Sequence, residues 1–307
     1  METSLPVARA SPEARVWVWV DAAAVCNLSC AHCYTASMQA AAVMALDTFR
    51  RVVGRLAGSG LRVQRFHLNW RGEPLANRAL PEMLRHLAEA APEWPVEWHT
   101  NGTLVTPERA ERLLAAHPAQ RVYVSLDGGN RASFERNRGE GAWRRALAGA
   151  EALLAARPRG AGPEVGIYQL DLGVPPEEYD PRFLELARAA DVHTVVKPVH
   201  TDGGPLVGLR RLPRGPCFWL GHTLAVDTSG GAHTCLLSGG SALGSLLEEP
   251  VETLLGRARA LRQAVVDGGR SRVPGCAGCF KEEGAPAAEA PSAAGVPARP
   301  ALAAAGA

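Results

Sequence analysis

The chain has 307 residues, of which 47% are hydrophobic and 21% charged, and its formal net charge is +2. This composition is typical of a globular protein of about two domains, and the absence of a basic block argues against nucleic acid as the main partner. Residues 1–13 lack the apolar core of a signal peptide, and the run 16–25 is interrupted by Asp21 and too short to cross a bilayer. We therefore expect a cytoplasmic protein without a membrane partner.

Segments with strand and helix character alternate along the first two thirds of the chain. A run of strand formers at 16–20 leads directly into a loop with three cysteines. Beyond it the periodicity predicts helices at 46–56, 80–90, 107–116, 143–156 and 181–190, and strands at 62–69, 96–99, 121–126, 164–170 and 193–199. This alternation predicts an α/β fold with a parallel sheet, whose chemistry lies at the carboxyl ends of the strands.

The composition changes near residues 202–205, and we place a domain boundary there. The first domain then spans 15–205, and a smaller α+β unit spans 206–281, with a hairpin at 223–235 and a helix at 251–266. Residues 1–14 and the Ala- and Pro-rich segment 282–307 are expected to be disordered.

The loop after the first strand holds Cys26, Cys30 and Cys33, followed by Tyr34. Disulfides are excluded because the chain has seven cysteines, an odd number, and no secretory signal. Structural zinc takes four ligands, and His32 is poorly placed between two cysteines to be the fourth. Three thiolates on a tight loop can instead hold a four-iron cluster and leave one iron open.

This spacing and its trailing aromatic residue resemble the signature of the radical S-adenosylmethionine (SAM) superfamily. The resemblance implies a 4Fe-4S cluster on the three cysteines, with SAM on the open iron and Tyr34 beside the cofactor. It also implies reductive cleavage of SAM to a 5′-deoxyadenosyl radical, with an electron donor such as flavodoxin or ferredoxin. The fold that it implies is a partial (β/α)6 barrel.

Polar residues follow the second and third predicted strands, where they could also be ordinary turn residues. Gly72 and Glu73 resemble the family motif that meets the amino group of SAM. Asn101 is a weaker candidate for cofactor binding, because Asn-Gly is itself a very common turn pair. Single histidines such as His99 are expected to be core or rim residues rather than zinc ligands.

The fourth predicted strand runs into a Ser-Leu-Asp-Gly sequence that contains Ser125 and Asp127. It resembles the family motif in which serine approaches the carboxylate or ribose of SAM. The resemblance also assigns Arg138 to the SAM carboxylate, a role that suits a fork-shaped guanidinium. Arg136 is an alternative for this role.

The four remaining cysteines lie in the C-terminal unit, at Cys217, Cys235, Cys276 and Cys279. Their arrangement resembles the Twitch domain, a shortened SPASM domain that binds an auxiliary 4Fe-4S cluster. A zinc ribbon is the alternative, since four thiolates also suit zinc. An auxiliary cluster with four protein ligands is implied to accept an electron rather than to bind substrate.

This layout resembles that of Twitch-containing alcohol dehydrogenases from aminocyclitol antibiotic pathways. It implies an oxidoreductase that abstracts a hydrogen from a small sugar or aminocyclitol alcohol and uses the auxiliary cluster as electron acceptor. Asp202, in the loop that enters the C-terminal unit, is the candidate polar contact or base. The sequence around Asp202 also fits a plain turn.

Three other functions stay open. An epimerase would return a hydrogen atom, usually from a thiol, but all seven cysteines are assigned above. A peptide-modifying enzyme with a leader-recognition domain would need more than the twenty-five residues before Cys26, although peptide substrates without that domain fit. A non-catalytic iron–sulfur or zinc scaffold would not need the SAM-binding motifs.

Overall fold

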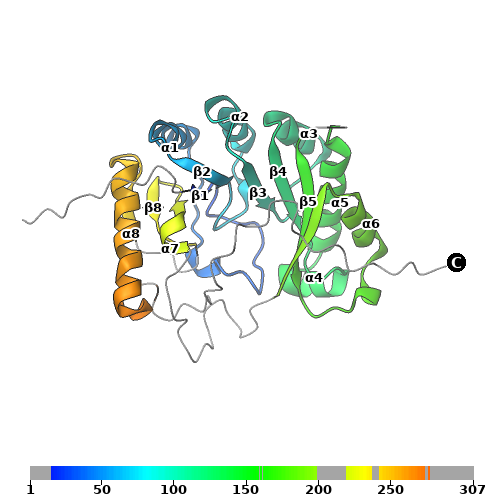
Figure 1. The fold of residues 1–307 in the computed structure, drawn as a ribbon. Coiled ribbons are helices and arrows are strands. Elements are labelled where there is room, and N and C mark those ends of the chain that lie inside the picture. The colour runs from blue at the N-terminus through cyan, green and yellow to red at the C-terminus, as the bar shows by residue number, and fades with distance from the viewer. Residues whose placement is uncertain are drawn as a thin grey trace, which may run out of the picture.

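The computed structural model describes residues 15–158, 160, 162–198, 219–236, 242–273 and 276. They form one nine-stranded sheet with the order β6-β5-β4-β3-β2-β1-β7-β8-β9 (Figure 1). Neighbours from β6 to β7 pair in parallel, and β8 and β9 are antiparallel additions. The strands are β1 (Arg15–Val20), β2 (Arg62–His67), β3 (Val96–Thr100), β4 (Gln120–Ser125), β5 (Glu164–Asp171), β6 (Val192–Pro198), β7 (Thr223–Val226), β8 (Gly231–His233) and β9 (Ala242–Ser245).

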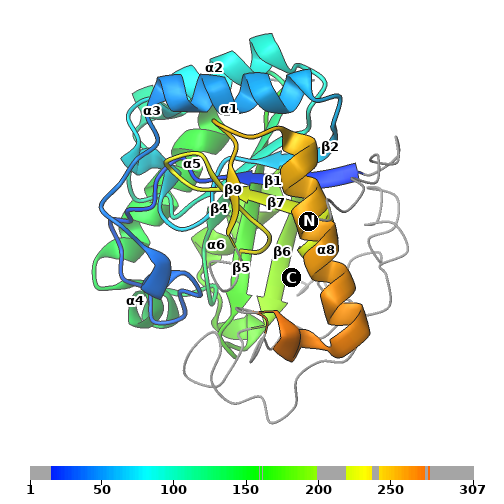
Figure 2. The same ribbon diagram turned by 90° about the vertical axis from the view of Figure 1, so that its left-hand side faces the viewer.

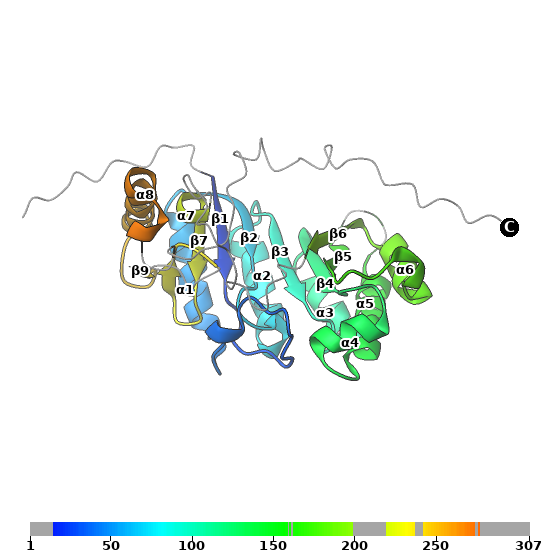
Figure 3. The same cartoon turned by 90° about the horizontal axis from the view of Figure 1, so that it is seen from below.

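Helices connect the parallel strands, line one side of the sheet and pack against one another (Figure 3). This confirms the predicted alternation of strands and helices. The helices of this part are α1 (Leu46–Gly58), α2 (Leu80–Ala90), α3 (Pro107–Ala116), α4 (Arg131–Arg138), α5 (Ala142–Ala156) and α6 (Pro181–Ala189). Single 3-10 turns are η1 (Ala36–Met38), η2 (Pro74–Ala76), η3 (Pro176–Glu178) and, near the C-terminus, η4 (Arg270–Arg272).

The two faces of the sheet differ in character because successive strand residues point to opposite sides. One face packs against the helices through side chains such as Val18, Phe66 and Trp98, which are fully buried in the main core. The opposite side, which we call the polar face, carries side chains that contact one another across the strands. They include Trp19, His67, Glu97, His99, Tyr123 and Tyr168.

The C-terminal part extends the same sheet. β7 pairs in parallel with β1, from Trp17 opposite Thr223 to Val20 opposite Val226. The hairpin of β7 and β8 is the predicted one. Helices α7 (Trp219–His222) and α8 (Val251–Gly268) pack on each other. Figure 2 shows α8 running beside this end of the sheet. The domain boundary at 205/206 lies outside the described residues and stays a prediction.

Among the helices and strands of the described residues, three were not predicted from the sequence: α4, α7 and β9. Of these, α4 matters most, because the predicted cofactor residue Arg138 is its last residue. The predicted disordered segments, 1–14 and 282–307, lie outside the described residues. Within the described part of the chain, no helix combines the length and apolar character needed to span a bilayer.

Candidate active site

The loop that carries Cys26, Cys30 and Cys33 begins at the end of β1, and its last residues lie beside its first ones. The Ala24 N–H donates to Ala42 O at 2.9 Å. The side-chain amide of Asn77 donates to Ala22 O and to Met44 O, at 2.8 Å each. Asn77 therefore ties the two ends of the cysteine loop together.

Gly72 and Glu73 hold the beginning of this loop. The Glu73 N–H donates to Val25 O, directly before Cys26, at 3.0 Å. A Cβ atom on Gly72 would stand 2.3 Å from Val25 O and 2.5 Å from Ala23 O. Only glycine permits this close approach of two backbones.

Replacing Gly72 by alanine is expected to displace the cysteine loop, because neither backbone can yield without losing hydrogen bonds. We expect a loss of stability of a few kcal/mol, as overpacking of a well-packed site causes, and less iron retained after anaerobic reconstitution. The matched control is Gly54→Ala in α1, where an added Cβ meets nothing within 4 Å. That variant should be as stable as wild type or more so. Equal behaviour of the two variants in urea unfolding and iron assay would contradict this role for Gly72.

The Glu73 carboxylate joins the cysteine loop to the end of β3. Its side chain is buried, and its oxygens accept hydrogen bonds from Thr100 Oγ1 at 2.7 Å, Asn101 N at 2.8 Å and Leu75 N at 3.2 Å. Burial raises the pKa of Glu73, and these hydrogen bonds oppose the rise. The acid is thus held in one position behind the loop.

Asn101 reaches from the end of β3 to the cysteine loop. Its side-chain amide donates to Asn27 Oδ1 at 3.0 Å and lies 3.9 Å from Cys26 Sγ. Asn27 in turn donates to Thr103 Oγ1 at 2.8 Å. This pair of contacts fixes the first cysteine of the loop against the carboxyl end of the sheet.

The sulfur atoms of the loop are approached by further polar groups. The Leu28 N–H lies 3.5 Å from Cys26 Sγ, Thr35 Oγ1 lies 3.3 Å from Cys33 Sγ, and Gln39 Nε2 lies 3.8 Å from the same sulfur. Burial raises the pKa of the Cys30 thiol to about 11, while the charge of Arg138 acts in the opposite direction. Hydrogen bonds to cysteine sulfur are a known means of tuning iron–sulfur clusters.

This donor set fits a four-iron cluster. Cys26, Cys30 and Cys33 are all half-buried free thiols on one loop. In the described part of the chain, no three His, Cys, Asp or Glu side chains meet at a single metal-ion position. A four-iron cluster does not require such a meeting point, because each thiolate binds a different iron.

The end of α4 holds the loop from its other side. Asn137 accepts from Ala31 N through its backbone oxygen at 2.7 Å and from His32 N through Oδ1 at 3.0 Å. Its Nδ2 group donates to Asp127 at 2.8 Å. A helix absent from the sequence-based prediction thus links the middle of the cysteine loop to the residue after β4.

Asp127 and Arg138 form a buried ion pair. Arg138 Nε donates to Asp127 Oδ2 at 2.6 Å, and Asp127 Oδ1 accepts from Leu170 N at 3.0 Å. Both Asp127 oxygens are therefore used by protein groups, which makes Asp127 a residue that positions Arg138. The alternative residue, Arg136, is exposed to solvent. The geometry favours Arg138 as the arginine beside the cysteines.

Two further predicted residues lie at the same end of the sheet. Ser125 ends β4, is 8% exposed, and stands opposite Tyr168 of β5. Tyr34 follows the last cysteine of the loop and is 40% exposed, so its ring is accessible. Direct contacts thus join Glu73 and Asn101 to the start of the cysteine loop at Cys26, and Asn137 links Asp127 and Arg138 to the same loop. Cys30, Cys33 and Gly72 belong to this loop and its support, with Ser125 and Tyr34 at the same end of the sheet.

The polar face holds a cluster that the sequence analysis missed. Glu97 accepts from Arg65 Nη1 at 2.6 Å, and its Oε1 lies 3.3 Å from His99 Nε2 and 3.6 Å from His67 Nδ1. His67 stacks on Trp19 with ring centroids 4.1 Å apart. Apolar and polar residues alternate in 96–100, whereas a strand buried on both faces would be continuously apolar. This alternation was the signal in the sequence for a polar face on this strand.

The Glu97 cluster predicts a pH dependence of stability. Burial alone would raise the pKa of Glu97, but the hydrogen bond from His99 and the charges of His67 and Arg65 lower it to about 2. The folded state therefore holds the carboxylate more strongly than the unfolded state does. This contribution, about 3 kcal/mol, is present above about pH 4.5 and is lost as the pH falls towards 2.

Urea unfolding of the metal-free protein at pH 6, 4 and 3 tests this expectation. The excess stability of wild type over Glu97→Gln should shrink as the pH falls. A stability difference between the two proteins that is constant with pH would show that Glu97 gains nothing from its neighbours.

The second cysteine set is described only in part. Cys235 follows β8, and Cys276 follows η4; both side chains are half-buried. Trp70 Nε1 donates to Leu236 O at 3.1 Å, which ties the neighbour of Cys235 to the turn that carries Gly72. Cys217, Cys279 and the candidate base Asp202 lie outside the described residues.

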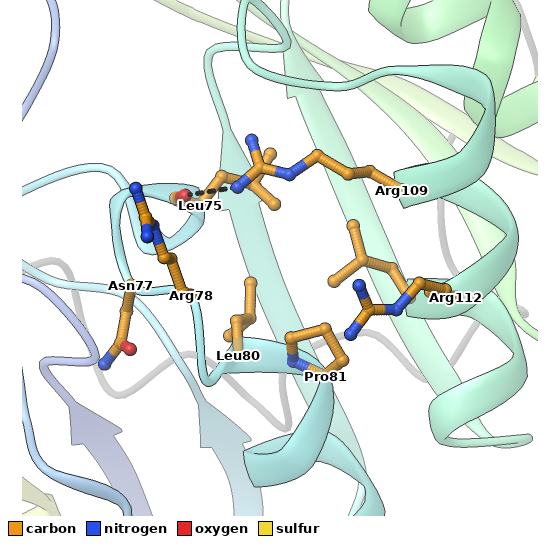
Figure 4. A pocket seen from close by; sticks show the side chains of 8 residues that line it. Leu75, Asn77, Arg78, Leu80, Pro81, Arg109 and Arg112 are labelled. Atoms are coloured by element: carbon orange, nitrogen blue, oxygen red, sulfur yellow. Dashed lines mark hydrogen bonds between the residues drawn. The ribbon is translucent and has the colours of Figure 1, made fainter.

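A cavity of about 230 Å³ opens in the helix layer (Figure 4). Arg78, Arg109 and Arg112 line it over an apolar floor that includes Leu80 and Leu113. Arg109 donates to Leu104 O at 2.7 Å. None of the predicted cofactor or metal residues lines this cavity.

Solved structures with the same fold include several SAM-bound proteins. The crystal structure of BtrN in complex with AdoMet and 2-DOIA aligns with a TM-score of 0.56 and 15% identity over 87% of this chain and 93% of that one. A structure of anSMEcpe with bound AdoMet aligns at 0.60 and 15% identity, covering 81% and 80%. At this identity the likeness shows the fold alone, and it confirms the predicted partial barrel.

Curated relatives match part of the chain. An AdoMet-dependent heme synthase of Methanosarcina barkeri (strain Fusaro / DSM 804) is 37% identical over 145 residues, 46% of this chain and 40% of the relative. A GTP 3′,8-cyclase of Synechococcus sp. (strain CC9902) is 30% identical over 175 residues, 54% of this chain and 49% of the relative. The match thus spans less than half of these relatives. The family profile of the radical SAM superfamily matches residues 22–193, more than half of the chain. The chain therefore belongs to the radical SAM superfamily.

Proposed function

We propose that this radical SAM enzyme is an oxidoreductase that converts an alcohol of a small sugar or aminocyclitol to a ketone. The likeness to BtrN supports this proposal, because it covers nearly the whole of both chains and the BtrN complex contains AdoMet and 2-DOIA. In this proposal the four C-terminal cysteines bind an auxiliary 4Fe-4S cluster in a Twitch-type domain.

The observation that carries the proposal is the attachment of the β7–β8 hairpin to β1. Because β7 runs parallel to β1, Cys235 lies just beyond a hairpin that is fixed beside the strand leading to Cys26. The Trp70–Leu236 hydrogen bond adds a second link between the two cysteine regions. Such an arrangement suits the passage of an electron from a substrate held between the two sites.

The residues of this chain would divide the work as follows. Cys26, Cys30 and Cys33 would hold the first cluster, while Arg138 and Ser125 would meet the carboxylate or ribose of SAM. When bound, SAM and the two clusters supply the hydrogen abstraction and the removal of the second electron, with flavodoxin or ferredoxin as the external reductant. Asp127 would keep Arg138 in place, and the backbone at Gly72 would keep the loop in place.

Iron content and product mass test this proposal together. Anaerobically reconstituted protein should carry about eight irons per chain. A content of about four irons and one zinc would contradict the proposal of an auxiliary iron–sulfur cluster. Incubation with SAM, reductant and a panel of 2-DOIA, myo-inositol and glucosamine should give a product lighter by two hydrogens. The same panel in deuterated water separates oxidation from epimerisation. A product that has lost no hydrogens but has gained one deuterium from the solvent would indicate epimerisation.

A peptide substrate is the second candidate, because structures of anSMEcpe with AdoMet and a bound peptide share the fold at a TM-score of 0.59. Adding cysteine- and serine-containing peptides to the panel distinguishes it. Modification of a peptide without oxidation of any cyclitol would replace the alcohol proposal.

A further inference from the structure

The proton between Glu97 and His99 can be assigned from their neighbours. Glu97 accepts from Arg65 at 2.6 Å and faces two histidines, so it is a carboxylate and can only accept hydrogen bonds. The hydrogen in the 3.3 Å contact with His99 must then sit on His99 Nε2. In a neutral imidazole this leaves Nδ1 with a lone pair, ready to accept a proton.

His99 is also well placed along β3. The next two residues, Thr100 and Asn101, are those that bind Glu73 at the rim of the cysteine loop. The His99 ring contacts the rings of Tyr123 and Tyr168, with centroids 5.0 and 5.1 Å away, and its backbone N–H donates to Asn69 Oδ1 at 3.1 Å. Its position is therefore fixed by three neighbouring strand regions.

The two histidines around Glu97 differ in access. The side chain of His99 is 25% exposed, whereas that of His67 is 6% exposed and stacks on Trp19. His99 is thus the member of the pair that a small molecule on the polar face can reach. Because His67 stands opposite Glu97, His99 lies two residues further towards the carboxyl edge of the sheet, where the cysteine loop sits.

We propose that His99 Nδ1 is the proton acceptor for the substrate hydroxyl, with Glu97 as its positioning residue. This inference rests on the proposed alcohol oxidation and names the base for it. When bound, SAM and the auxiliary cluster would supply the removal of one hydrogen atom from the substrate carbon and of one electron, while His99 would accept the hydroxyl proton. The balance is an alcohol converted to a ketone, with the C–H and O–H bonds broken and a C=O bond formed.

The variant His99→Gln tests the assignment, with His86→Gln in α2 as the matched control on the helix side. We expect His99→Gln to keep forming 5′-deoxyadenosine while ketone formation falls about 100-fold or more, the usual effect of losing a general base. His86→Gln should behave as wild type. Added imidazole should partly restore ketone formation in His99→Gly.

The pH profile provides a readout that a structural role would not move. A general base must hold a free lone pair to accept a proton. In wild type, ketone formation should therefore fall at low pH, and that fall should be absent in His99→Gln. The other titratable groups facing this site are Arg65, His67, Arg121, Tyr123, Glu164 and Tyr168. Glu97→Gln should shift the pH at which ketone formation falls but should not abolish the fall, because this variant changes the hydrogen-bond partner of His99 and keeps His99 itself.

A substrate-free measurement decides the proton assignment independently. In ¹⁵N-labelled reconstituted protein, the ring nitrogens of His99 should show the Nε2–H tautomer in NMR spectra. An Nδ1–H tautomer would overturn the inference. So would an unchanged ketone rate in His99→Gln together with its loss in Asp202→Asn. If the wild-type protein oxidises no alcohol, the proposed function itself is wrong, and the role of His99 as its base is wrong with it.

Discussion

Cys30→Ala is expected to abolish the formation of 5′-deoxyadenosine, a loss of at least about 10³-fold, as for an obligate catalytic group. Cys30 is one of three thiolates on the loop, and a cluster left with two protein ligands should not be retained. The loop itself should stay in place, because Asn137 holds Ala31 and His32 through their backbone N–H groups. Anaerobic incubation with SAM and dithionite, followed by chromatography, measures the effect.

The matched control is Cys276→Ala, which removes a thiol of the second set. This variant should form 5′-deoxyadenosine near the wild-type rate but should give little oxidised product. If Cys30→Ala still cleaves SAM at a substantial rate, the assignment of the three-cysteine loop is wrong. If Cys276→Ala gives a normal product yield, the electron-acceptor role of the auxiliary cluster fails instead.

Asp127→Ala is expected to lower the free energy of unfolding of the metal-free protein by about 3–5 kcal/mol. The carboxylate is fully buried and binds Arg138, Asn137 and the Leu170 N–H. Its removal leaves the Arg138 guanidinium, whose side chain is only 13% exposed, without its charged partner. Because Asn137 also holds the cysteine loop, iron retention should fall as well.

Asp47→Ala provides the matched control in urea unfolding. Asp47 pairs with Arg50 at 3.2 Å, but its side chain is 90% exposed, so the pair should add little to stability. An Asp127→Ala variant as stable as Asp47→Ala would show that the buried pair does not support the site.

The alternation of strands and helices could be predicted because both kinds of element have strong local signals. The ranges predicted for the second and third helices agree with α2 and α3 at both ends, since each has an apolar stripe and a proline in its first turn. The cysteine loop was equally readable, because three thiolates at this spacing have few other uses.

α4 could not be predicted because its stability comes from contacts that the sequence does not display. Its eight residues are mostly polar, with Phe134 as the large apolar side chain. The helix is held by the Asn130 cap, which accepts from Ser133 N at 3.0 Å, and by packing of Phe134 on Trp143. The sequence analysis therefore assigned Arg138 from its motif alone, and its contact with Asp127 could not be foreseen.

The Glu97 cluster was missed for a different reason. His67 and Glu97 are thirty residues apart, and they meet only because β2 and β3 pair with these two residues opposite each other. The sequence analysis treated each histidine singly, whereas the parallel register brings His67 beside Glu97 on the polar face. Register across a sheet depends on long-range pairing, which local patterns do not encode.

The pairing of β1 with β7 has a consequence for synthesis of the protein. β1 lies near residue 20 and its partner β7 near residue 225. During synthesis, one edge of β1 therefore stays unpaired until about two hundred further residues have been made. That edge belongs to a strand rich in valine and tryptophan, the kind that invites pairing with other chains. Long-range parallel pairing of this kind is also slow to form. The nascent chain is therefore most exposed to aggregation at its first strand, and a ribosome-bound chaperone or slow release would protect it there.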